Sequence, residues 1–294
     1  MLVDIGCLAE QNRDFHVEID CKVWSPRMKI FDPHCHMISR VTDDYEKMAL
    51  AGIQAVVEPA FWLGEPRKRA GSFYDYFDHI AGFERTRAAN YLIDHYCAIA
   101  FNPRESNNVA LRDEVLGEMP KWLGRPSVVA VGEIGFDDIT DAEETSIRRQ
   151  LELARASDLP VIVHTPHVQK LKGTLRTIEI IHKIGFPPER VIIDHNTEET
   201  IAASRESGCW SGHTIYPVTK LSPERAVNIL EKHGLEKMLI NSSCDWGPSD
   251  PLMVPRTVLE MRRRGFSATE IQRVVWDNPI AFFRQSKRLN PNLV

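Results

Sequence analysis

The sequence predicts an α/β protein, specifically a (β/α)8 barrel. Short apolar runs typical of buried strands alternate eight times with longer stretches whose apolar residues recur at helical spacing. The first junction between a strand and a helix reads DPHCHM and lacks the glycine-rich phosphate turn of a doubly wound sheet. Both observations favour a closed barrel over an open sheet.

Length and composition agree with one large globular domain. The 294 residues suit a single barrel, and 43% hydrophobic with 26% charged residues are ordinary values. No apolar stretch reaches the roughly 18 residues that a membrane-spanning helix needs. The six cysteines are scattered without CxxC pairs, and the N-terminus lacks a basic start followed by an apolar run. We therefore expect a cytoplasmic protein with reduced thiols.

The strands and helices follow in order along the chain. Residues 1–27 have mixed charge and are expected to form an N-terminal extension, with residues 28–294 forming a single barrel domain. The expected strands are 29–33, 53–58, 94–101, 128–135, 160–165, 190–195, 209–215 and 237–243. The expected helices are 42–51, 72–91, 108–123, 141–157, 168–184, 198–207, 223–233 and 252–264, followed by further helical turns.

The 141–157 window illustrates the helical signal. Ile147, Leu151 and Ala154 recur at spacings of four and three, which places them on one face of a helix. Leu159 and Pro160 then end the run before the next strand. A helix in this position would cover the sheet with its apolar face.

Residues that bind metals cluster at the expected strand ends. His34 and His36 alternate with Cys35, so both imidazoles point to the same side of an extended strand. In a barrel the carboxyl ends of all strands meet at one mouth. Metal-ligand side chains stand at five of these ends: His34 and His36, Glu133, His164, His195 and Asp245. Because an apolar strand has little structural use for such side chains, the pattern predicts a metal site.

The chain also resembles a known family, the TatD-like metal-dependent hydrolases of the amidohydrolase superfamily. The resemblance runs from about residue 29 to 284 and rests on DPHCH, VGEIGFD, RRQLELARASDLPVIVH, the DH at 194–195, Asp245 and NPIAFF. It implies an amidohydrolase-like barrel with two divalent metal ions. His34 and His36 would hold one ion, His164 and His195 the other, and Glu133 would bridge them. Asp245 would complete the shell of the first ion.

Departures from the family pattern concern the substrate. Nucleases of the family commonly carry HxR after the fifth strand, whereas this chain has His164-Thr165-Pro166. Glu198 and Glu199 follow His195 and are expected near the mouth. Together with a net charge of -5, these features argue against a nucleic-acid partner. We expect a small, neutral or weakly charged substrate.

Several further residues are candidates for the site. Phe61 and Trp62, after the second strand, would form an apolar substrate wall, or else pack against a neighbouring helix or subunit. His213 and Tyr216, on the seventh strand, would line the mouth or pack in the core. Asp245 is our candidate catalytic base, which would take a proton from the activated water.

The sequence therefore predicts a metal-dependent hydrolase that acts on a small-molecule ester, lactone or amide through water activated by two divalent ions, Zn, Mn or Mg. A TatD-like deoxyribonuclease is the first alternative. A non-catalytic binding or assembly module on the same barrel is the second, and the intact set of six ligands argues against it. No membrane partner is expected. The oligomeric state, the native metal and the substrate's identity are left open by the sequence.

Overall fold

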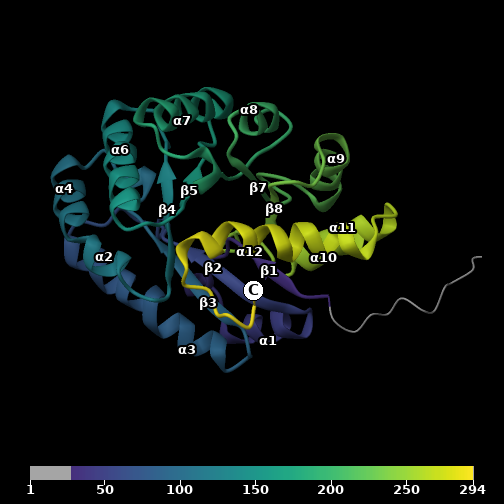
Figure 1. Ribbon diagram of the computed structural model, residues 1–294. Coiled ribbons are helices and arrows are strands. Elements are labelled where there is room, and N and C mark those ends of the chain that lie inside the picture. The colour runs from purple at the N-terminus through teal and green to yellow at the C-terminus, as the bar shows by residue number, and fades with distance from the viewer. Residues whose placement is uncertain (1–27, 294) are drawn as a thin grey trace, which may run out of the picture.

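The computed structural model describes residues 28–293, which form a barrel of parallel strands surrounded by helices (Figure 1). The expected extension, residues 1–27, lies outside the described residues. Each strand pairs in parallel with the next one along the chain. The eight strands are β1 (Ile30–Asp32), β2 (Ile53–Pro59), β3 (Asp94–Ile99), β4 (Val128–Gly135), β5 (Val161–His164), β6 (Val191–Ile193), β7 (Trp210–Thr214) and β8 (Met238–Asn241).

Main-chain hydrogen bonds just beyond the strands join the first strand to the last. The Ser243 amide donates to the His34 carbonyl at 2.8 Å, and the His36 amide donates to the Cys244 carbonyl at 2.9 Å. These bonds draw the two ends of the sheet together on the side where the strands finish. The predicted (β/α)8 barrel is confirmed, and all eight strands lie where the sequence predicts them.

Helices alternate with the strands and cover the outside of the barrel (Figure 1). They are α1 (Thr42–Leu50), α2 (Ala70–Asp78), α3 (Glu84–Ala89), α4 (Val109–Glu118), α5 (Pro120–Leu123), α6 (Asp141–Ala156), α7 (Lys170–Ile184), α8 (Ile201–Glu206), α9 (Pro223–His233), α10 (Met253–Arg263), α11 (Ala268–Gln272) and α12 (Asn278–Phe283). Short π-helical turns at His79–Phe83 and Arg273–Asp277 join α2 to α3 and α11 to α12. Single-turn 3₁₀ helices lie at Met37–Ser39, Pro103–Glu105, Pro188–Arg190 and Arg284–Ser286.

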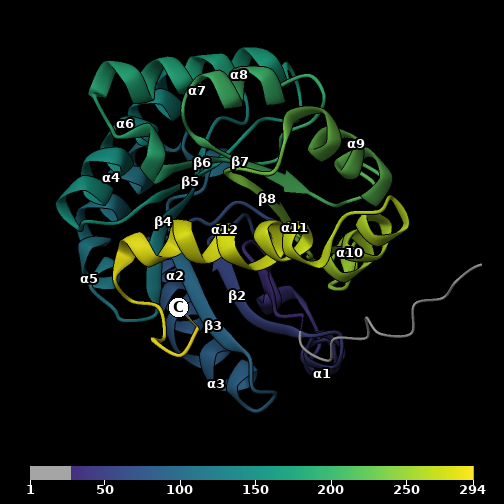
Figure 2. The same ribbon diagram turned by 45° about the vertical axis from the view of Figure 1, so that its right-hand side comes forward.

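The C-terminal helix α12 packs against the end of the barrel where the strands begin (Figure 2). Its Phe283 ring stacks on Phe31 of β1, with ring centroids 5.7 Å apart. The Asn278 side-chain amide donates to the carbonyl of Met238, the first residue of β8. This end is therefore filled with apolar side chains, which leaves the opposite end as the place for a polar site.

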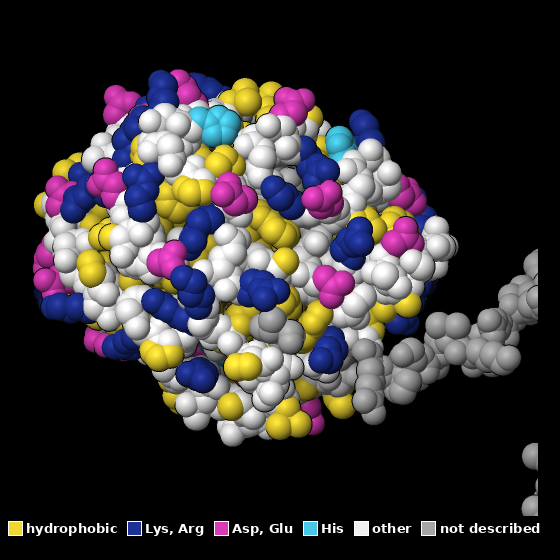
Figure 3. All heavy atoms as spheres, in the orientation of Figure 1, with side chains coloured by type: hydrophobic (Ala, Val, Ile, Leu, Met, Phe, Trp, Pro, Cys, Tyr) yellow, Lys and Arg dark blue, Asp and Glu magenta, His cyan; other side chains and the backbone are white. Residues whose placement is uncertain are grey.

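Charged side chains of both signs are interspersed on the face shown in Figure 3. That face carries no continuous basic tract of the kind that follows a nucleic-acid backbone. Within residues 28–293, no helix combines the length and the hydropathy that crossing a bilayer requires.

Candidate metal centre

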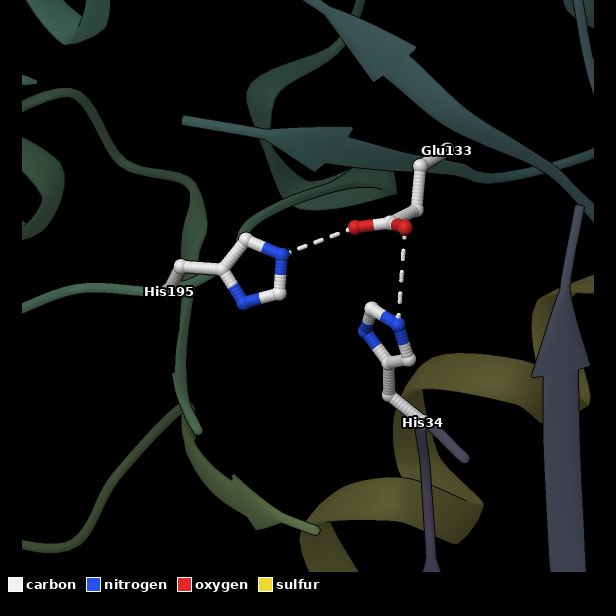
Figure 4. Close-up of side chains that lie close together, drawn as sticks. All are labelled: His34, Glu133 and His195. Atoms are coloured by element: carbon white, nitrogen blue, oxygen red, sulfur yellow. Dashed lines mark hydrogen bonds and ion pairs between the residues drawn. The ribbon is translucent and has the colours of Figure 1, made fainter. Parts of the chain in front are cut away.

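Three side chains from distant parts of the chain form a buried group with the geometry of a metal site. One ligand atom each from His34, Glu133 and His195 lies within 4.8 Å of the others. Figure 4 shows the Glu133 carboxylate between the two imidazoles, with one oxygen toward each ring. His34 follows β1, Glu133 lies on β4 and His195 follows β6, so the barrel topology itself brings them together.

The other two predicted histidines face the same carboxylate. Glu133 Oε2 lies 3.6 Å from His34 Nε2 and 3.9 Å from His36 Nε2. Glu133 Oε1 lies 2.8 Å from His195 Nε2 and 3.4 Å from His164 Nδ1. Two histidines therefore face each carboxylate oxygen. This division of the four rings is the one that the family resemblance implies for a bridging carboxylate.

Two glycines on β4 explain how Glu133 comes so close to β5. A Cβ atom on Gly132 would lie 2.7 Å from the Cβ of Ile162, and one on Gly135 would lie 2.2 Å from the carbonyl oxygen of His164. Gly135 also has a backbone φ of 147°, a conformation that residues other than glycine rarely adopt. The sequence Gly-Glu-Ile-Gly thus allows two backbones to approach closely, and it sets Glu133 beside His164.

A buried carboxylate orients His34. Asp194 Oδ2 accepts a hydrogen bond from His34 Nδ1 at 2.6 Å, and the Asn241 amide donates to both oxygens of Asp194. Burial alone would raise the pKa of Asp194, but His195 and His34 outweigh it and lower that pKa, so the carboxylate is ionised. A proton therefore lies on Nδ1 of His34, and Nε2 is the ring nitrogen that faces the cluster.

A second chain of hydrogen bonds orients His195. Since the Asn241 amide nitrogen donates to Asp194, its carbonyl oxygen accepts from the Thr214 hydroxyl at 2.9 Å. Thr214 Oγ1 lies 2.6 Å from His195 Nδ1 and has already used its only hydrogen, so it accepts from the ring. His195 Nε2 is thus left with a lone pair that points at Glu133. Asn241 connects the partners of both histidines.

The resulting electrostatics fit a metal ion. His195 Nε2 and Glu133 Oε1 are two acceptors facing each other at 2.8 Å, which is repulsive unless a cation or a second proton compensates. Burial and Lys220 hold the pKa of His195 well below its usual value, which disfavours the second proton. Although burial raises the pKa of Glu133, the histidines, His34 foremost, hold it well below its ordinary range. Neutral imidazoles and an ionised carboxylate are the forms that ligate divalent ions.

Asp245, the sixth predicted ligand, lies outside this compact group. Its Oδ1 accepts hydrogen bonds from the Tyr216 hydroxyl at 2.9 Å and from the Gly247 amide at 2.8 Å. Burial and the bond to Asp245 raise the pKa of Tyr216 to about 12, so the hydroxyl keeps its proton and donates. Asp245 still lines the cavity above the cluster.

The cavity beside the cluster has a volume of about 250 Å³. Phe61 and Trp62 line it, as does Trp246, and the Phe61 ring stacks on His36 with centroids 3.8 Å apart. His213 and Tyr216 are not among the lining residues within the described chain. Burial lowers the pKa of His213 to about 4, and its Nδ1 donates to the carbonyl of Leu239. Tyr216 reaches the site only through Asp245.

The sequence analysis assigned no role to several residues of this site. Lys220 and Arg104 line the cavity, and Asp194, Thr214 and Asn241 orient the histidines. Asp194 and Asn241 could have been found, because each is a polar side chain at the end of a short apolar strand. Lys220 lies in a loop, where a lysine is ordinary and carries no signal.

Known proteins with similar structures or sequences indicate the class of protein to which this chain belongs. The barrel is similar to the organophosphorus hydrolase from Deinococcus radiodurans, with a TM-score of 0.66 over 87% of this chain and 92% of that one, at 16% identity. At that identity the likeness shows the fold alone. A TatD-like protein from Archaeoglobus fulgidus has a TM-score of 0.72 and 28% identity over 86% of this chain and 99% of its own. An uncharacterized metal-dependent hydrolase from Methanocaldococcus jannaschii is 29% identical over 258 residues, which is 87% of this chain and all of that protein.

The family follows from a direct match. The model of the TatD related DNase family matches residues 31–284, so the chain belongs to that family. The protein is accordingly a metal-dependent hydrolase on a TIM barrel, and the suspected TatD-like resemblance is confirmed.

Proposed function

We propose that the centre holds two divalent ions. His34 and His36 would hold one and His164 and His195 the other, with Glu133 between them. The support is the pairing of two histidines with each carboxylate oxygen, with one ring nitrogen of each histidine lying 2.8–3.9 Å from it. The ligand role expected for Asp245 is not part of this proposal, because Asp245 lies outside the compact group of His34, Glu133 and His195.

Divalent ions in such a centre supply an acidified water and positive charge that polarises the scissile bond. The chain itself orients the histidine rings and supplies a group that accepts a proton during the reaction. Asp245 faces the cavity with Oδ2 uncommitted among the contacts of the described residues, and it serves as general base in this proposal. Tyr216 and the Gly247 amide hold the carboxylate in place.

The substrate we propose is a small-molecule ester, lactone or amide. The observation that carries this proposal is the cavity of about 250 Å³, walled by Phe61, Trp62 and Trp246 directly over the cluster. A space of this size suits a compact substrate packed against aromatic rings. The expected acidic rim plays no part, since Glu198 pairs with Arg225 and neither Glu198 nor Glu199 lines the cavity.

Metal content and turnover test the proposal together. Purified protein is loaded with Zn, Mn or Mg in turn, analysed for bound metal, and assayed on esters, lactones, amides, phosphoesters and single-stranded DNA. We expect two ions per chain and the highest kcat/KM on a small ester, lactone or amide. His34→Ala and His164→Ala should each lose one ion, because catalytic ions have few protein ligands to spare. Two ions retained in both variants would refute the ligand assignment.

The alternative function is the nuclease activity in the family's name. Binding a polyanion makes the rate fall steeply with salt. Degradation of DNA that is salt-sensitive and faster than turnover of every small substrate would replace our proposal with this one. The non-catalytic alternative is set aside, because the chain belongs to a family of hydrolases.

A further inference from the structure

Lys220 brings a positive charge to the cavity from the loop after β7. That loop is tight, with the Lys220 amide donating to the Tyr216 carbonyl at 2.8 Å and the Tyr216 amide donating to the Leu221 carbonyl at 2.9 Å. The ammonium lies 5.6 Å from the centre of the Tyr216 ring, and the side chain lines the cavity. Within residues 28–293, Lys220 Nζ makes neither an ion pair nor a hydrogen bond.

Three carboxylates influence this lysine electrostatically, and none of them forms an ion pair with it within residues 28–293. Burial lowers the pKa of Lys220, while the negative charges of Glu133, Asp194 and Asp245 raise it. All three carboxylates are therefore close enough to interact electrostatically with its ammonium group. Glu133 faces four histidines and Asp194 binds His34. Asp245 binds Tyr216 through Oδ1, and within residues 28–293 no ion pair joins its Oδ2 to Lys220. A partly buried ammonium without its own partner is costly, which points to a negative group supplied from outside the chain.

Arg104 adds a second cation to the cavity wall. It belongs to the 3₁₀ turn after β3, and its guanidinium lies 4.1 Å from the centre of the Trp62 ring. Its Nε lies 3.7 Å from Asp137 Oδ2, and its side chain is 55% exposed, so the guanidinium is available at the rim. Lys220 and Arg104 thus combine with the aromatic wall in one cavity.

We propose that the substrate carries an anionic group, a carboxylate or a phosphate, apart from the bond that is hydrolysed, and that Lys220 binds this group with Arg104 assisting at the rim. The inference rests on the proposed function and refines its weakly charged substrate. Lys220 acts here as a specificity residue. A lysine is suited to either anion, since its ammonium is a compact charge without the directional fork of arginine.

The test uses three esters of one chromophoric alcohol, 4-nitrophenol, whose acyl chains end in a methyl ester, a carboxylate or a phosphonate. For each variant of the metal-loaded protein we measure the ratio of kcat/KM for each anionic ester to that for the neutral one. We expect the wild type to favour one anionic ester by about 10- to 100-fold, the contribution of a hydrogen bond to a charged group. Lys220→Met should reduce this ratio to near one, and Lys220→Arg should restore part of it.

Lys172→Met is the matched control, because Lys172 is an exposed lysine on α7 outside this cavity. It should keep the wild-type ratio. If Lys220→Met keeps that ratio too, or if the wild type shows no preference for either anionic ester, the inference is overturned. The ester that the wild type favours distinguishes carboxylate from phosphate.

A binding measurement separates this inference from the proposed function. Succinate and phosphonoacetate are titrated calorimetrically into the metal-loaded wild type and Lys220→Met. Binding that Lys220→Met weakens about tenfold or more, without turnover of any ester, would support the anion site and refute the proposed reaction. Ester turnover with equal acid binding by both proteins would refute the anion site alone.

Discussion

The four histidines of the centre fall into two pairs that are held differently. His34 and His195 each have a second buried partner, Asp194 and Thr214, which fixes the protonated nitrogen of the ring. His36 has no partner for Nδ1 among the described residues; its ring stacks on Phe61, and its Nε2 lies 3.0 Å from Nε2 of His34. His164 is the most exposed of the four, with 16% of its side chain accessible against 1–3% for the others.

This difference has a consequence for metal binding. In the proposed centre each ion receives one histidine from the oriented pair and one from the less constrained pair. The oriented ring already points its Nε2 at the site before the metal arrives, so less ordering is needed on binding. Because Asn241 links Asp194 to Thr214, the two oriented histidines are connected by one network and should respond together.

The largest effect should come from Glu133, which faces both pairs. Glu133→Gln keeps the shape but removes the charge, so we expect loss of both ions and a fall in kcat/KM of roughly 10⁴-fold or more. Elemental analysis and steady-state kinetics would measure this. Glu152→Gln, an exposed glutamate on α6, should leave both unchanged. Two tightly bound ions in Glu133→Gln would show that the pairs are independent of the carboxylate.

Asp245 stands outside both pairs, so its replacement should separate metal binding from catalysis. Asp245→Asn should retain both ions and lower kcat by roughly 10²–10⁴-fold, the contribution of a proton-transfer group. Asp75→Asn, at an exposed site on α2, is the control. A variant that turns over at nearly the wild-type rate would remove Asp245 from the mechanism, and one that loses an ion would return it to the ligands.

Variants that change what holds one ring of each pair would test the difference between the two pairs. Asp194→Asn leaves His34 donating to a weaker, neutral acceptor, so affinity for metal should fall about 10- to 100-fold. Phe61→Leu removes only the stacking on His36 and should weaken binding by less than about tenfold. Competition with a chelating dye would measure both affinities. A greater loss in Phe61→Leu would reverse the proposed order of the pairs.

The smallest effect should follow Thr214→Val, which keeps the shape of the side chain while removing the acceptor of His195. The loss of one neutral hydrogen bond should reduce metal affinity by roughly fivefold. The double variant with Asp194→Asn should fall short of the product of the single effects, since Asn241 joins both residues. Thr145→Val, on the exposed side of α6, serves as control. Fully independent effects would show that the network does not couple the histidines.

The sequence determined the barrel and the set of imidazole and carboxylate side chains at its strand ends. Strand and helix periodicities are local, and the alternation of eight such units admits few other topologies. Once the strands are parallel, their ends must meet, and His34, Glu133, His164 and His195 meet with them. The glycines beside Glu133 are also a local feature of the sequence, because their lack of a side chain allows β4 and β5 to approach closely.

Only the tertiary structure decided how these side chains are oriented. Asp194 binds His34, which is 160 positions away in the sequence. Asp245 accepts a hydrogen bond from Tyr216 and lies outside the compact group of His34, Glu133 and His195. Lys220 enters the cavity from a loop whose sequence gives no sign of it. The strength of hydrogen bonds and charge pairs depends on distances between atoms to within fractions of an ångström. Here those atoms belong to segments that are remote along the chain, and no local residue pattern specifies the distance between them.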